Sequence, residues 1–598
     1  MEARERSIQE VFCDGRVLRV PFFQRHYKWG EDQWNRFDAD MMGLIERGDN
    51  YKYFLGSLIL KEDQITEQER QDDVTSKYTV IDGQQRLTTL TIYLKALVNQ
   101  IEDKSKKRRF NNLFLYNIDV APTPKLIHSM NDRGAYRDII LDGRTAFSNY
   151  ISDKIIRAYE YFQKQFRDRN NQNLIDVLQA IYSKITFVVV SLNQNDDEQR
   201  IFDTINSLGL KLTIDELMKN FLYQRENEDE YRRNWMPIFD TFDDNDRRTF
   251  WDDNDAATSQ SARDNNTVIY NFFFDFVRIK MWDYALSPRH RSQFVKKDCV
   301  LDACKAFVED YGADKQELAN EIIEYAKLYK KYFDKNKLNA PIPRMASIER
   351  IATIAMAYSN PMRAYLLYIL RNVDDEAQRN DIFAFLETYM VRRAICGSDN
   401  STSEIWAQQL ICKRINSLDQ LRTHIMNWGI DISTHMPSSY EVLDALKSKD
   451  SKKYAQLILY LYESKINDSI DVGYNYFTVR QIIPTPKVNN RTIYPPYADV
   501  EKEKQRKNII KTLGNYLLLK LGDNNFTAED LKEELRVVKK FDNKAFNEKK
   551  RSLQLYFKQV RCMNQWFPEE TQWNENSINN RNESLARIVE KIWNINEA

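Results

Sequence analysis

The sequence predicts an α+β protein of several domains. Apolar β-branched runs alternate with helical patterns over residues 1–100, and a further buried-strand pattern ends near residue 190. Residues 221–440 carry apolar side chains three and four apart, with few prolines, which is typical of helices. A chain of 598 residues is too long for one hydrophobic core. We therefore predict a mixed α/β domain at 1–225, a helical region at 226–440 and a third domain at 441–598.

The composition narrows the class of protein. Apolar residues make up 42% and charged residues 29%, which indicates a soluble, globular chain. Lys plus Arg and Asp plus Glu are both 88, so a nucleic-acid surface would have to be a local patch. The six cysteines lack a C-x-x-C spacing and the N-terminus is no signal peptide. No apolar run approaches the ~18 residues of a membrane span, so we expect a cytoplasmic protein with no membrane partner.

The elements of the first hundred residues follow from their apolar spacing. Residues 17–21 are predicted as a short strand that enters a loop, and residues 31–45 as a helix. Residues 53–60 and 77–81 are predicted strands, because they are short runs rich in β-branched and aromatic residues. The polar stretch 61–76 between them is predicted as an exposed loop.

The central stretch of the chain runs from residue 78 to residue 98. Its apolar start turns at Asp82-Gly83 and continues with apolar residues at helical spacing, which predicts a strand, a tight turn and a helix. Gly83 lets the backbone approach a ligand, and the first N–H groups of the helix suit a phosphate. Arg86 adds a bidentate phosphate donor. The alternative for this turn is an ordinary polar helix start at the surface.

Four motifs in this chain carry a family resemblance. Residues 82–90, Asp-Gly-Gln-Gln-Arg-Leu-Thr-Thr-Leu, resemble the signature of the ParB-like N-terminal domain of GmrSD-type restriction proteins. Residues 21–29 resemble the family's upstream Gln-Arg-x-Tyr-x-Trp motif, residues 54–60 its glycine-serine strand, and residues 200–220 its downstream motif. Four matches in order over about two hundred residues form a specific signal.

The resemblance implies a ParB/sulfiredoxin-like fold and a domain that binds and hydrolyses a nucleoside triphosphate with Mg²⁺. A metal would be held by Asp82 or a neighbour, and Gln84 or Gln85 is a candidate for orienting the attacking water. The candidate catalytic residues are Asp82, Gln84, Gln85 and Arg86. The candidate nucleotide-binding residues are Gln24, Arg25, Tyr27, Trp29, Gly56, Ser57, Gly83 and Asn206.

Several of these residues also have ordinary structural interpretations. A surface salt bridge explains Arg25 equally well, and a core contact explains Trp29. Tyr27 and Trp29 are alternatively candidates for stacking on a base. Asn206 fits either a wall of the nucleotide site or a helix C-cap. The nucleotide hypothesis requires that the segments near residues 25 and 85 converge on one triphosphate.

Charged stretches outside these motifs leave two interpretations open. Residues 104–109 are a basic cluster, which fits either a solvated helix end or a phosphate contact. Residues 243–255 are acidic around Trp251 and are predicted as an exposed linker or loop. Arg392 and Arg393 fit either DNA contact or intramolecular pairing.

Residues 441–598 resemble the family's C-terminal HNH-like domain, with one altered motif. Residues 513–518 match its Gly-Asn-Leu motif, but its Glu-His-Ile-x-Pro reads Arg480-Gln481-Ile482-Ile483-Pro484 in this chain. A glutamine cannot accept a proton near pH 7, and an arginine repels a metal cation. None of the five histidines lies in this region. The altered motif predicts a mostly helical, degenerate HNH-like domain in which Gln481 and Asn515 are remnants of the site.

A basic run near the C-terminus offers a way to hold DNA without cutting it, although a solvated helix face explains it equally well. The run comprises Lys539, Lys540, Lys544, Lys549, Lys550, Arg551 and Lys558.

The sequence as a whole predicts a GmrSD-like anti-phage defence protein with a nucleotide-dependent N-terminal domain and a DNA-binding C-terminal domain. The expected partners are a nucleotide and DNA, with modified phage DNA among the candidates, and an oligomer is left open. One alternative is an active modification-dependent DNA endonuclease with a rearranged site. Another is a non-enzymatic module that only binds nucleotide or nucleic acid.

Overall fold

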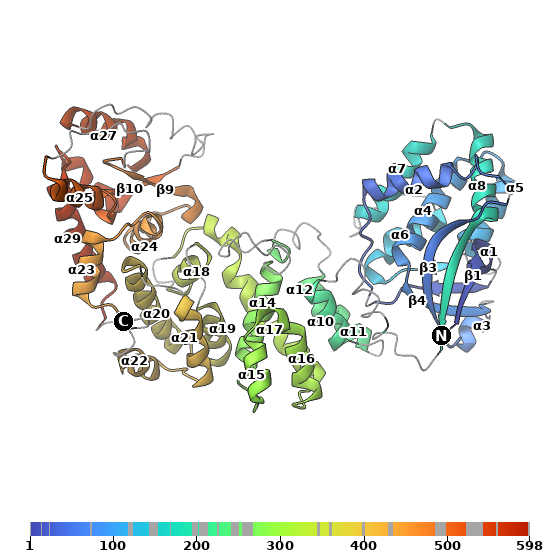
Figure 1. Cartoon of the computed structure of the whole chain (residues 1–598), viewed down its shortest axis with the longest axis horizontal. Coiled ribbons are helices and arrows are strands. Elements are labelled where there is room, and N and C mark those ends of the chain that lie inside the picture. Colours follow the sequence, from blue (N-terminus) through green and yellow to red (C-terminus); the bar gives the residue numbers. More distant parts are fainter. Residues whose placement is uncertain are drawn as a thin grey trace. The chain divides into compact units, whose positions relative to one another are not determined.

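A computed structural model of the chain divides into two compact units, Met1–Thr249 and Phe250–Ala598. Figure 1 shows the ribbon with most of its longer helices labelled. Each unit is considered by itself. The structure describes residues 2–13, 15–22, 24–48, 50–71, 74–117, 123–142, 153–167, 169–193, 201, 213–223, 227–240, 250–253, 267–343, 347–357, 362–397, 401–427, 435–484, 498–521, 542–557 and 560–595.

The first unit is built around a six-stranded mixed sheet. The strand order is β1-β8-β3-β4-β2-β7. The pairs β1–β8 and β3–β4 are antiparallel, whereas β3–β8, β2–β4 and β2–β7 are parallel. The strands are β1 (Glu2–Ser7), β2 (Arg16–Arg19), β3 (Tyr53–Glu62), β4 (Ser76–Asp82), β7 (Leu126–Ile127) and β8 (Ile185–Leu192).

Irregular pairing of β3 shapes the part of the sheet that matters below. The β3–β8 register shifts between Phe54 and Gly56, and the β3–β4 register shifts between Ile59 and Leu60. Such bulges bend a strand and redirect its side chains. The last residue of β4, Asp82, pairs with Ile59 of β3. The end of β4 therefore lies beside the irregular part of β3.

Helix α4 (Gln84–Gln100) is the central helix of this unit. Most of its side chains are buried, because it packs against α5, α6, α7 and α8. Tyr93 of α4 makes edge-on ring contacts with Phe37, Phe162 and Phe166. The neighbouring helices are α2 (Glu31–Met42), α5 (Lys104–Phe114), α6 (Met130–Asp142), α7 (Asp153–Phe166) and α8 (Asn171–Lys184).

Short elements complete the first unit. They are α1 (Ile8–Val11), α3 (Glu67–Gln71), β5 (Tyr116–Asn117), β6 (Thr123–Pro124), α10 (Ile214–Leu222), α11 (Glu228–Glu230), a π-helix at Tyr231–Trp235 and α12 (Met236–Phe239). The predicted strands and the helix over 31–45 are confirmed. The predicted loop at 61–76 contains α3, and the basic cluster at 104–109 begins α5, where Asp103 caps the helix.

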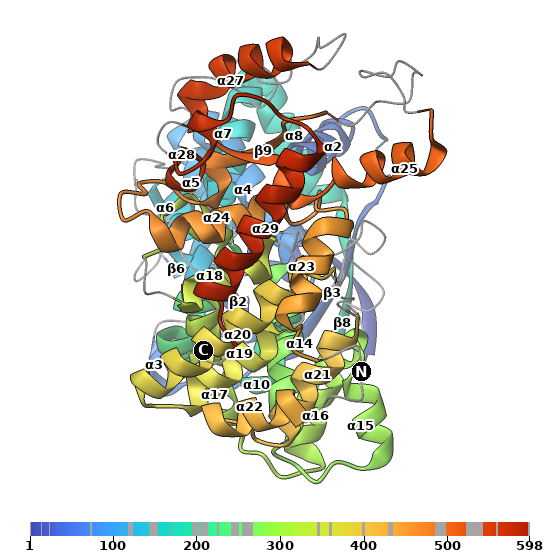
Figure 2. The ribbon, with the colours of Figure 1, turned by 90° about the vertical axis from the view of Figure 1, so that its left-hand side faces the viewer.

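The second unit is mostly helical, as predicted for residues 226–440 and 441–598, and Figure 2 shows its helices from a second side. The only sheet among its described residues is the antiparallel pair β9 (Phe477–Gln481) and β10 (Tyr516–Lys520). Its longer helices are α14 (Val268–Lys280), α16 (Val300–Glu309), α17 (Lys315–Phe333), α18 (Ser347–Ala357), α19 (Arg363–Asn372), α20 (Glu376–Ile395), α21 (Ser401–Cys412), α22 (Leu418–Asn427), α23 (Ser439–Ser448), α24 (Ala455–Ile466), α25 (Val500–Ile509), α27 (Asn543–Phe557) and α29 (Glu575–Ile592). Two shorter helices are α15 (Pro288–Phe294) and α28 (Arg561–Asn564).

The predicted second and third domains pack together within this one unit. Arg392 of α20 is fully buried, and its guanidinium donates to the carbonyl oxygens of Pro437 and Trp593 at 2.8 and 3.0 Å. Of the two alternatives for Arg392, intramolecular pairing is therefore the one observed. The indole of Trp593 donates in turn to Glu387 at 2.7 Å.

Trp251 corrects one expectation from the sequence. The sequence places Trp251 in an exposed acidic linker or loop. In the structure its side chain is fully buried against the rings of Phe272 and Tyr329. Much of that acidic stretch lies outside the described residues. Among the helices that the structure does describe, none combines the length and the apolar character that crossing a membrane requires.

Candidate functional site

The turn between β4 and α4 leaves a helix start without side-chain partners. Gly83 occupies the N-cap position with φ of 98°, in the left-handed region that favours glycine. A Cβ atom there would lie 2.3 Å from Cδ2 of Leu58. The first turn of α4 has no side-chain cap and no acidic residue. The first N–H groups of this helix are therefore available to an anion.

Arg86 is held beside this helix start in a fixed orientation. Its Nη2 donates to Oδ2 of Asp82 at 3.0 Å, and its side chain remains 25% exposed. The guanidinium lies against Gly56 of β3, where φ is 132° and an added Cβ would be 1.8 Å from Nη1 of Arg86. Gly56 thus provides the space that the guanidinium fills, next to the bulge in β3. This contact links two of the sequence motifs.

Two glutamine side chains join the segment near residue 25 to the β4–α4 turn. Nε2 of Gln24 donates to the carbonyl oxygen of Ile81 at 2.7 Å, and Nε2 of Gln84 donates to the carbonyl oxygen of Arg25 at 2.9 Å. Both side chains are buried, at 8% and 3% exposure. Oε1 of Gln84 is buried without a hydrogen-bond partner among the described residues.

Gln85 completes this connection. Its Oε1 accepts from the backbone N–H of Lys28 at 2.7 Å, and its Nε2 donates to the carbonyl oxygen of His26 at 3.1 Å. The segments near residues 25 and 85, which the nucleotide hypothesis places together, are thus in contact. The three glutamines hold the segments together, a role that the sequence analysis did not anticipate. Both ends of the Gln85 amide are bonded, whereas Gln84 keeps one unpaired acceptor, Oε1, inside the fold.

The aromatic residues of the upstream motif face the core. Tyr27 is 1% exposed, and its hydroxyl lies 2.6 Å from Oγ1 of Thr89 and accepts from the indole of Trp34 at 2.8 Å. The ring therefore has no free face on which a base could stack. Trp29 is half-buried and makes an edge-on contact with Phe37 at 6.4 Å. For Trp29 the core contact is thus present, and it leaves part of the ring exposed.

The remaining candidate residues divide into two groups. Arg25 and Ser57 are half-buried, and the structure gives their side chains no hydrogen bond or ion pair with any described residue. The salt bridge considered for Arg25 is therefore absent among those residues. Asn206 and most of its motif lie outside the described residues.

A buried acid–histidine cluster supports the same segment and was missed by the sequence analysis. The Asp132 carboxylate is completely buried and accepts from the backbone N–H of Tyr27 at 2.9 Å. Nδ1 of His26 lies 3.7 Å from Oδ1 of Asp132, and Nδ1 of His128 lies 3.8 Å from Oδ2. Nε2 of His128 is 2.9 Å from Oγ1 of Thr88, in the first turns of α4. The only signal in the sequence was the spacing of His128 and Asp132, four residues apart.

Burial controls the ionisation of this cluster. Desolvation lowers the pKa of His128 from 6.5 to about 4, although Asp132 acts in the opposite direction. Burial also raises the pKa of Asp132, but the hydrogen bond and charge of His26, followed by His128 and the Tyr27 N–H, outweigh it and lower the pKa overall. The folded protein therefore holds a neutral His128 beside an ionised Asp132 at neutral pH.

This arrangement predicts acid sensitivity of α4. As the pH falls from 7 toward 4, the unfolded chain protonates His128 and the folded chain does not, so the free energy of opening decreases. Protonation of His128 in the unfolded chain lowers the free energy of opening at pH 5 by about 2 kcal/mol relative to pH 7. The stabilisation that comes from the lowered pKa of Asp132 is fully present above about pH 4, so it does not change the pH dependence between pH 7 and pH 5.

Hydrogen exchange of the α4 amides, corrected for intrinsic rates, measures the effect. We expect His128→Gln to flatten the pH dependence and His290→Gln, in the second unit, to leave it unchanged. A slope that persists in His128→Gln contradicts this explanation.

In the C-terminal region, Asn515 is a structural residue. Its side chain is fully buried, and Nδ2 donates to the carbonyl oxygens of Ile483 and Ile510 at 2.8 and 2.6 Å. Its Oδ1 accepts from the N–H of Ile483 at 2.9 Å and from the indole of Trp573 at 3.2 Å. Every hydrogen-bonding position of the amide is therefore used inside the fold.

Gln481 lies at the end of β9 and is also engaged. Its Nε2 donates to the carbonyl oxygen of Ile510 and to the hydroxyl of Tyr516, at 3.0 and 3.2 Å. Nζ of Lys549 donates to the Gln481 carbonyl oxygen at 2.6 Å, and burial together with Arg480 lowers the pKa of Lys549 to about 8. A protein cation thus lies beside Gln481.

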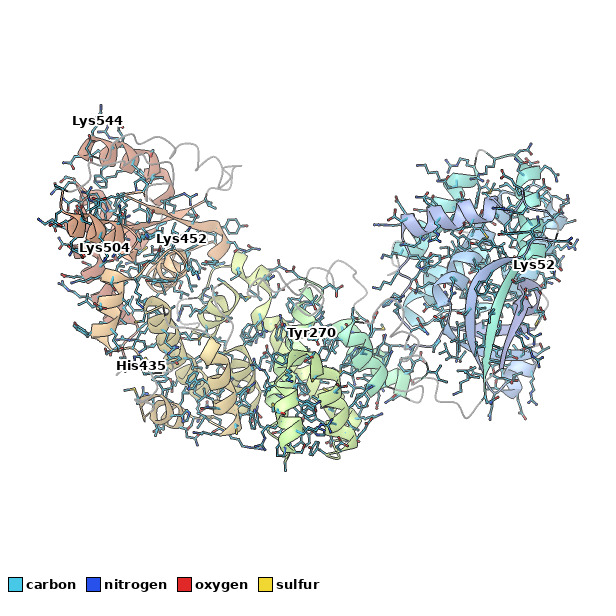
Figure 3. All side chains as sticks on the ribbon, in the orientation of Figure 1. Lys52, Tyr270, His435, Lys452, Lys504 and Lys544 are labelled. Carbon is cyan, nitrogen blue, oxygen red and sulfur yellow. The ribbon has the colours of Figure 1, made fainter. Side chains whose placement is uncertain are left out.

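The predicted basic run is only partly a surface feature. Lys549 and Lys550 point inward and donate to backbone carbonyl oxygens. Lys544 is exposed at the beginning of α27 (Figure 3), and Arg551 is exposed farther along the same helix. Lys539, Lys540 and Lys558 lie outside the described residues. Within the described part of the chain, no three His, Cys, Asp or Glu side chains are grouped so that they could hold a metal ion.

Comparisons with known proteins agree with the motifs at both ends. Residues 8–223 match the family model of the GmrSD restriction endonuclease N-terminal domain. Residues 436–588 match the model of the GmrSD restriction endonuclease C-terminal domain. A search of curated proteins finds no match. The first match spans both segments that the three glutamines connect, and the second spans Gln481 and Asn515.

Proposed function

Because the chain belongs to the GmrSD restriction endonuclease family, we propose that it is an anti-phage defence protein controlled by a nucleotide. In this proposal the N-terminal domain binds and hydrolyses a nucleoside triphosphate in the cytoplasm. The C-terminal domain binds DNA, with modified phage DNA among the candidate targets. The observation that carries the proposal is the helix start at Gln84, which lacks a side-chain cap and lies beside the fixed guanidinium of Arg86.

The residues at this helix start fit a triphosphate. The N–H groups at the beginning of α4 and the helix dipole favour a phosphate, and Arg86 supplies a planar donor. Arg25 is brought close by the Gln84 hydrogen bond to its carbonyl oxygen, and its guanidinium has no partner among the described residues. Ser57 offers a hydroxyl on the neighbouring strand. We propose the ParB/sulfiredoxin-like topology for this domain on the same grounds.

The chain also offers one residue for a metal ion. Asp82 would hold Mg²⁺ with its second carboxylate oxygen, since only Oδ2 is paired with Arg86 and the side chain is 34% exposed. The ion, when bound, neutralises charge on the phosphate oxygens. Gln84 is proposed to orient the attacking water through its unpaired Oε1, and Arg86 to stabilise the negative charge that develops in the transition state.

We propose that the C-terminal domain retains an HNH-like fold and binds DNA without cutting it. The chain has Arg480 and Gln481 where the family has a carboxylate and a histidine. Arg480 repels a metal cation, and Gln481 cannot take a proton at neutral pH. The Lys549 ammonium beside Gln481 adds to the positive charge. These positive charges attract the phosphates of the DNA backbone, but they do not supply the metal ion that cleavage requires.

Triphosphate turnover and DNA integrity, measured together, test this function. The purified protein is incubated with each nucleoside triphosphate and Mg²⁺, with and without modified phage DNA. We expect phosphate release and intact DNA. Arg86→Ala should lower kcat/KM for hydrolysis about 100-fold, because it removes a charged donor to the transition state. Arg70→Ala, an exposed arginine of α3, should leave it unchanged.

Three outcomes count against the proposal. Full hydrolysis by Arg86→Ala would show that the start of α4 is not the catalytic site. Metal-dependent nicking of DNA would show instead that the C-terminal domain is an active endonuclease with a rearranged site. Nucleotide binding without turnover would leave only a binding module.

A further inference from the structure

A cavity of about 600 Å³ lies within the second unit, far along the chain from the nucleotide site. Its walls come from α18, α20, α24 and α29, and the residue Gln565 adds to one side. All four helices are labelled in Figures 1 and 2. Two of them belong to the predicted helical middle region and two to the C-terminal region. The volume is in the range of protein sites for small molecules.

The charged groups of this cavity are all positive. Arg350, Lys465 and Lys591 line it, and none of the described residues that line it carries a carboxylate. Glu387 is close to two of these cations: its Oε1 lies 3.0 Å from Nε of Arg350 and 3.0 Å from Nζ of Lys465. One buried carboxylate therefore faces two cations and already accepts from Trp593. Lys591 has no ion pair with any residue that the structure describes.

Burial disfavours the charged form of Lys465 in this cavity. Desolvation lowers the pKa of Lys465, Arg350 lowers it further, and Glu387 only partly opposes both. A buried carboxylate shared by two cations explains how Arg350 and Lys465 are held. It does not account for Lys591, which adds a third positive charge at the opening of the same cavity. A negatively charged ligand would be attracted by all three.

The uncharged part of the wall is apolar. Ile466, Ile588 and Ile592 line it at partial exposure. The ring of Tyr462 adds an aromatic surface, and its hydroxyl donates to Oε1 of Gln565 at 2.9 Å. The amide nitrogen of Gln565 has no hydrogen bond to a described residue and is available as a donor. Partly exposed isoleucines beside lysines suit a molecule that carries an apolar body and a charged end.

We propose that this cavity is an effector site for a small organic anion with an apolar or aromatic body. The anionic group lies between Arg350, Lys465 and Lys591, and the body contacts the isoleucines of α24 and α29. A ligand in this position contacts helices of the middle region and of the C-terminal region at once. Its binding energy therefore stabilises their packing, and it couples the ligand to the state of the C-terminal domain. This site is separate from the proposed nucleotide site and does not depend on it.

Binding of two defined anions to the full-length chain tests the proposal. AMP and decanoate serve as probes with a nucleoside body and an alkyl body, and isothermal titration calorimetry measures each affinity. The Arg86→Ala variant is the background, so that the N-terminal site does not contribute. We expect saturable binding of at least one probe, and the one that binds identifies the kind of body.

Lys591 provides the decisive variant, because it is exposed and outside the buried ion pair. Lys591→Glu should weaken binding at least tenfold, since it replaces an attraction by a repulsion. Lys591→Arg should bind as the original chain does, because the positive charge is kept. Lys504→Glu is the matched control, since Lys504 is an exposed lysine of α25 outside the cavity (Figure 3). Absence of saturable binding by both probes overturns the proposal, and so does an affinity that Lys591→Glu leaves unchanged.

Discussion

Gly56→Ala is expected to lower triphosphate turnover sharply while the chain remains folded. An alanine Cβ would lie 1.8 Å from Nη1 and 2.9 Å from Cζ of Arg86, so the guanidinium has to leave its position. The φ of 132° adds backbone strain for any residue with a Cβ. We expect a stability loss of about 1–3 kcal/mol from strain and crowding. Hydrolysis should fall about 100-fold, as for Arg86→Ala.

The chain contains a suitable control for this substitution. Gly48 lies in the same unit, its φ is not in the left-handed region, and a Cβ there meets nothing within 4 Å. Gly48→Ala should therefore leave both stability and turnover unchanged. Adding Gly56→Ala to Arg86→Ala should produce little further loss, since both act on one guanidinium. Additive losses, or full turnover in Gly56→Ala alone, would mean that the Gly56–Arg86 contact has no part in catalysis.

Asn515→Ala is expected to destabilise the second unit by on the order of 4 kcal/mol. The substitution removes four hydrogen bonds. It leaves the N–H and carbonyl oxygen of Ile483 and the Trp573 indole N–H without this partner, whereas the Ile510 carbonyl oxygen keeps the hydrogen bond from Gln481. Each buried polar group left unpaired costs about 1–3 kcal/mol, with partial relief where water enters. Urea unfolding of the full-length chain, followed by hydrogen exchange of β10, measures the loss.

A remnant of a catalytic site would behave differently. If Asn515 were retained only as a trace of a former metal site, its replacement would be neutral or stabilising. Asn547 of α27 is the matched control, because it is exposed and bonds only to the Asn543 carbonyl oxygen of its own helix. Asn547→Ala should change stability by less than about 0.5 kcal/mol. A stability change for Asn515→Ala as small as that of Asn547→Ala would refute the structural role of Asn515.

The local elements could be predicted because their signals are local. The strand, turn and helix over residues 78–98 follow from a change of apolar period and from the aspartate and glycine between them. The left-handed glycine at 83 and the capping box at Thr213 are properties of a few adjacent residues. The motifs near residues 25 and 85 indicated that distant segments belong to one site, and the family match covers both.

The roles of the polar side chains could not be predicted in the same way. A glutamine offers the same donors and acceptors whether it binds a ligand or a backbone, and the fold decides which group it meets. Gln84 and Gln85 meet carbonyl oxygens 59 residues away in the chain, and Tyr27 meets Asp132 at a separation of 105 residues. Trp251 was assigned to the surface because its neighbours in sequence are acidic, whereas its contacts are rings of distant helices.

The sequence by itself determined the order of the elements, the glycine turn before the central helix and the family to which both ends belong. Only the tertiary structure decided that three glutamines hold the site together, that Gly56 makes room for Arg86, and that Asn515 supports the C-terminal fold. The physical reason is that backbone conformation depends mainly on neighbouring residues. Hydrogen-bond partners and buried charges depend on which distant groups the folded chain brings within about 3 Å of each other.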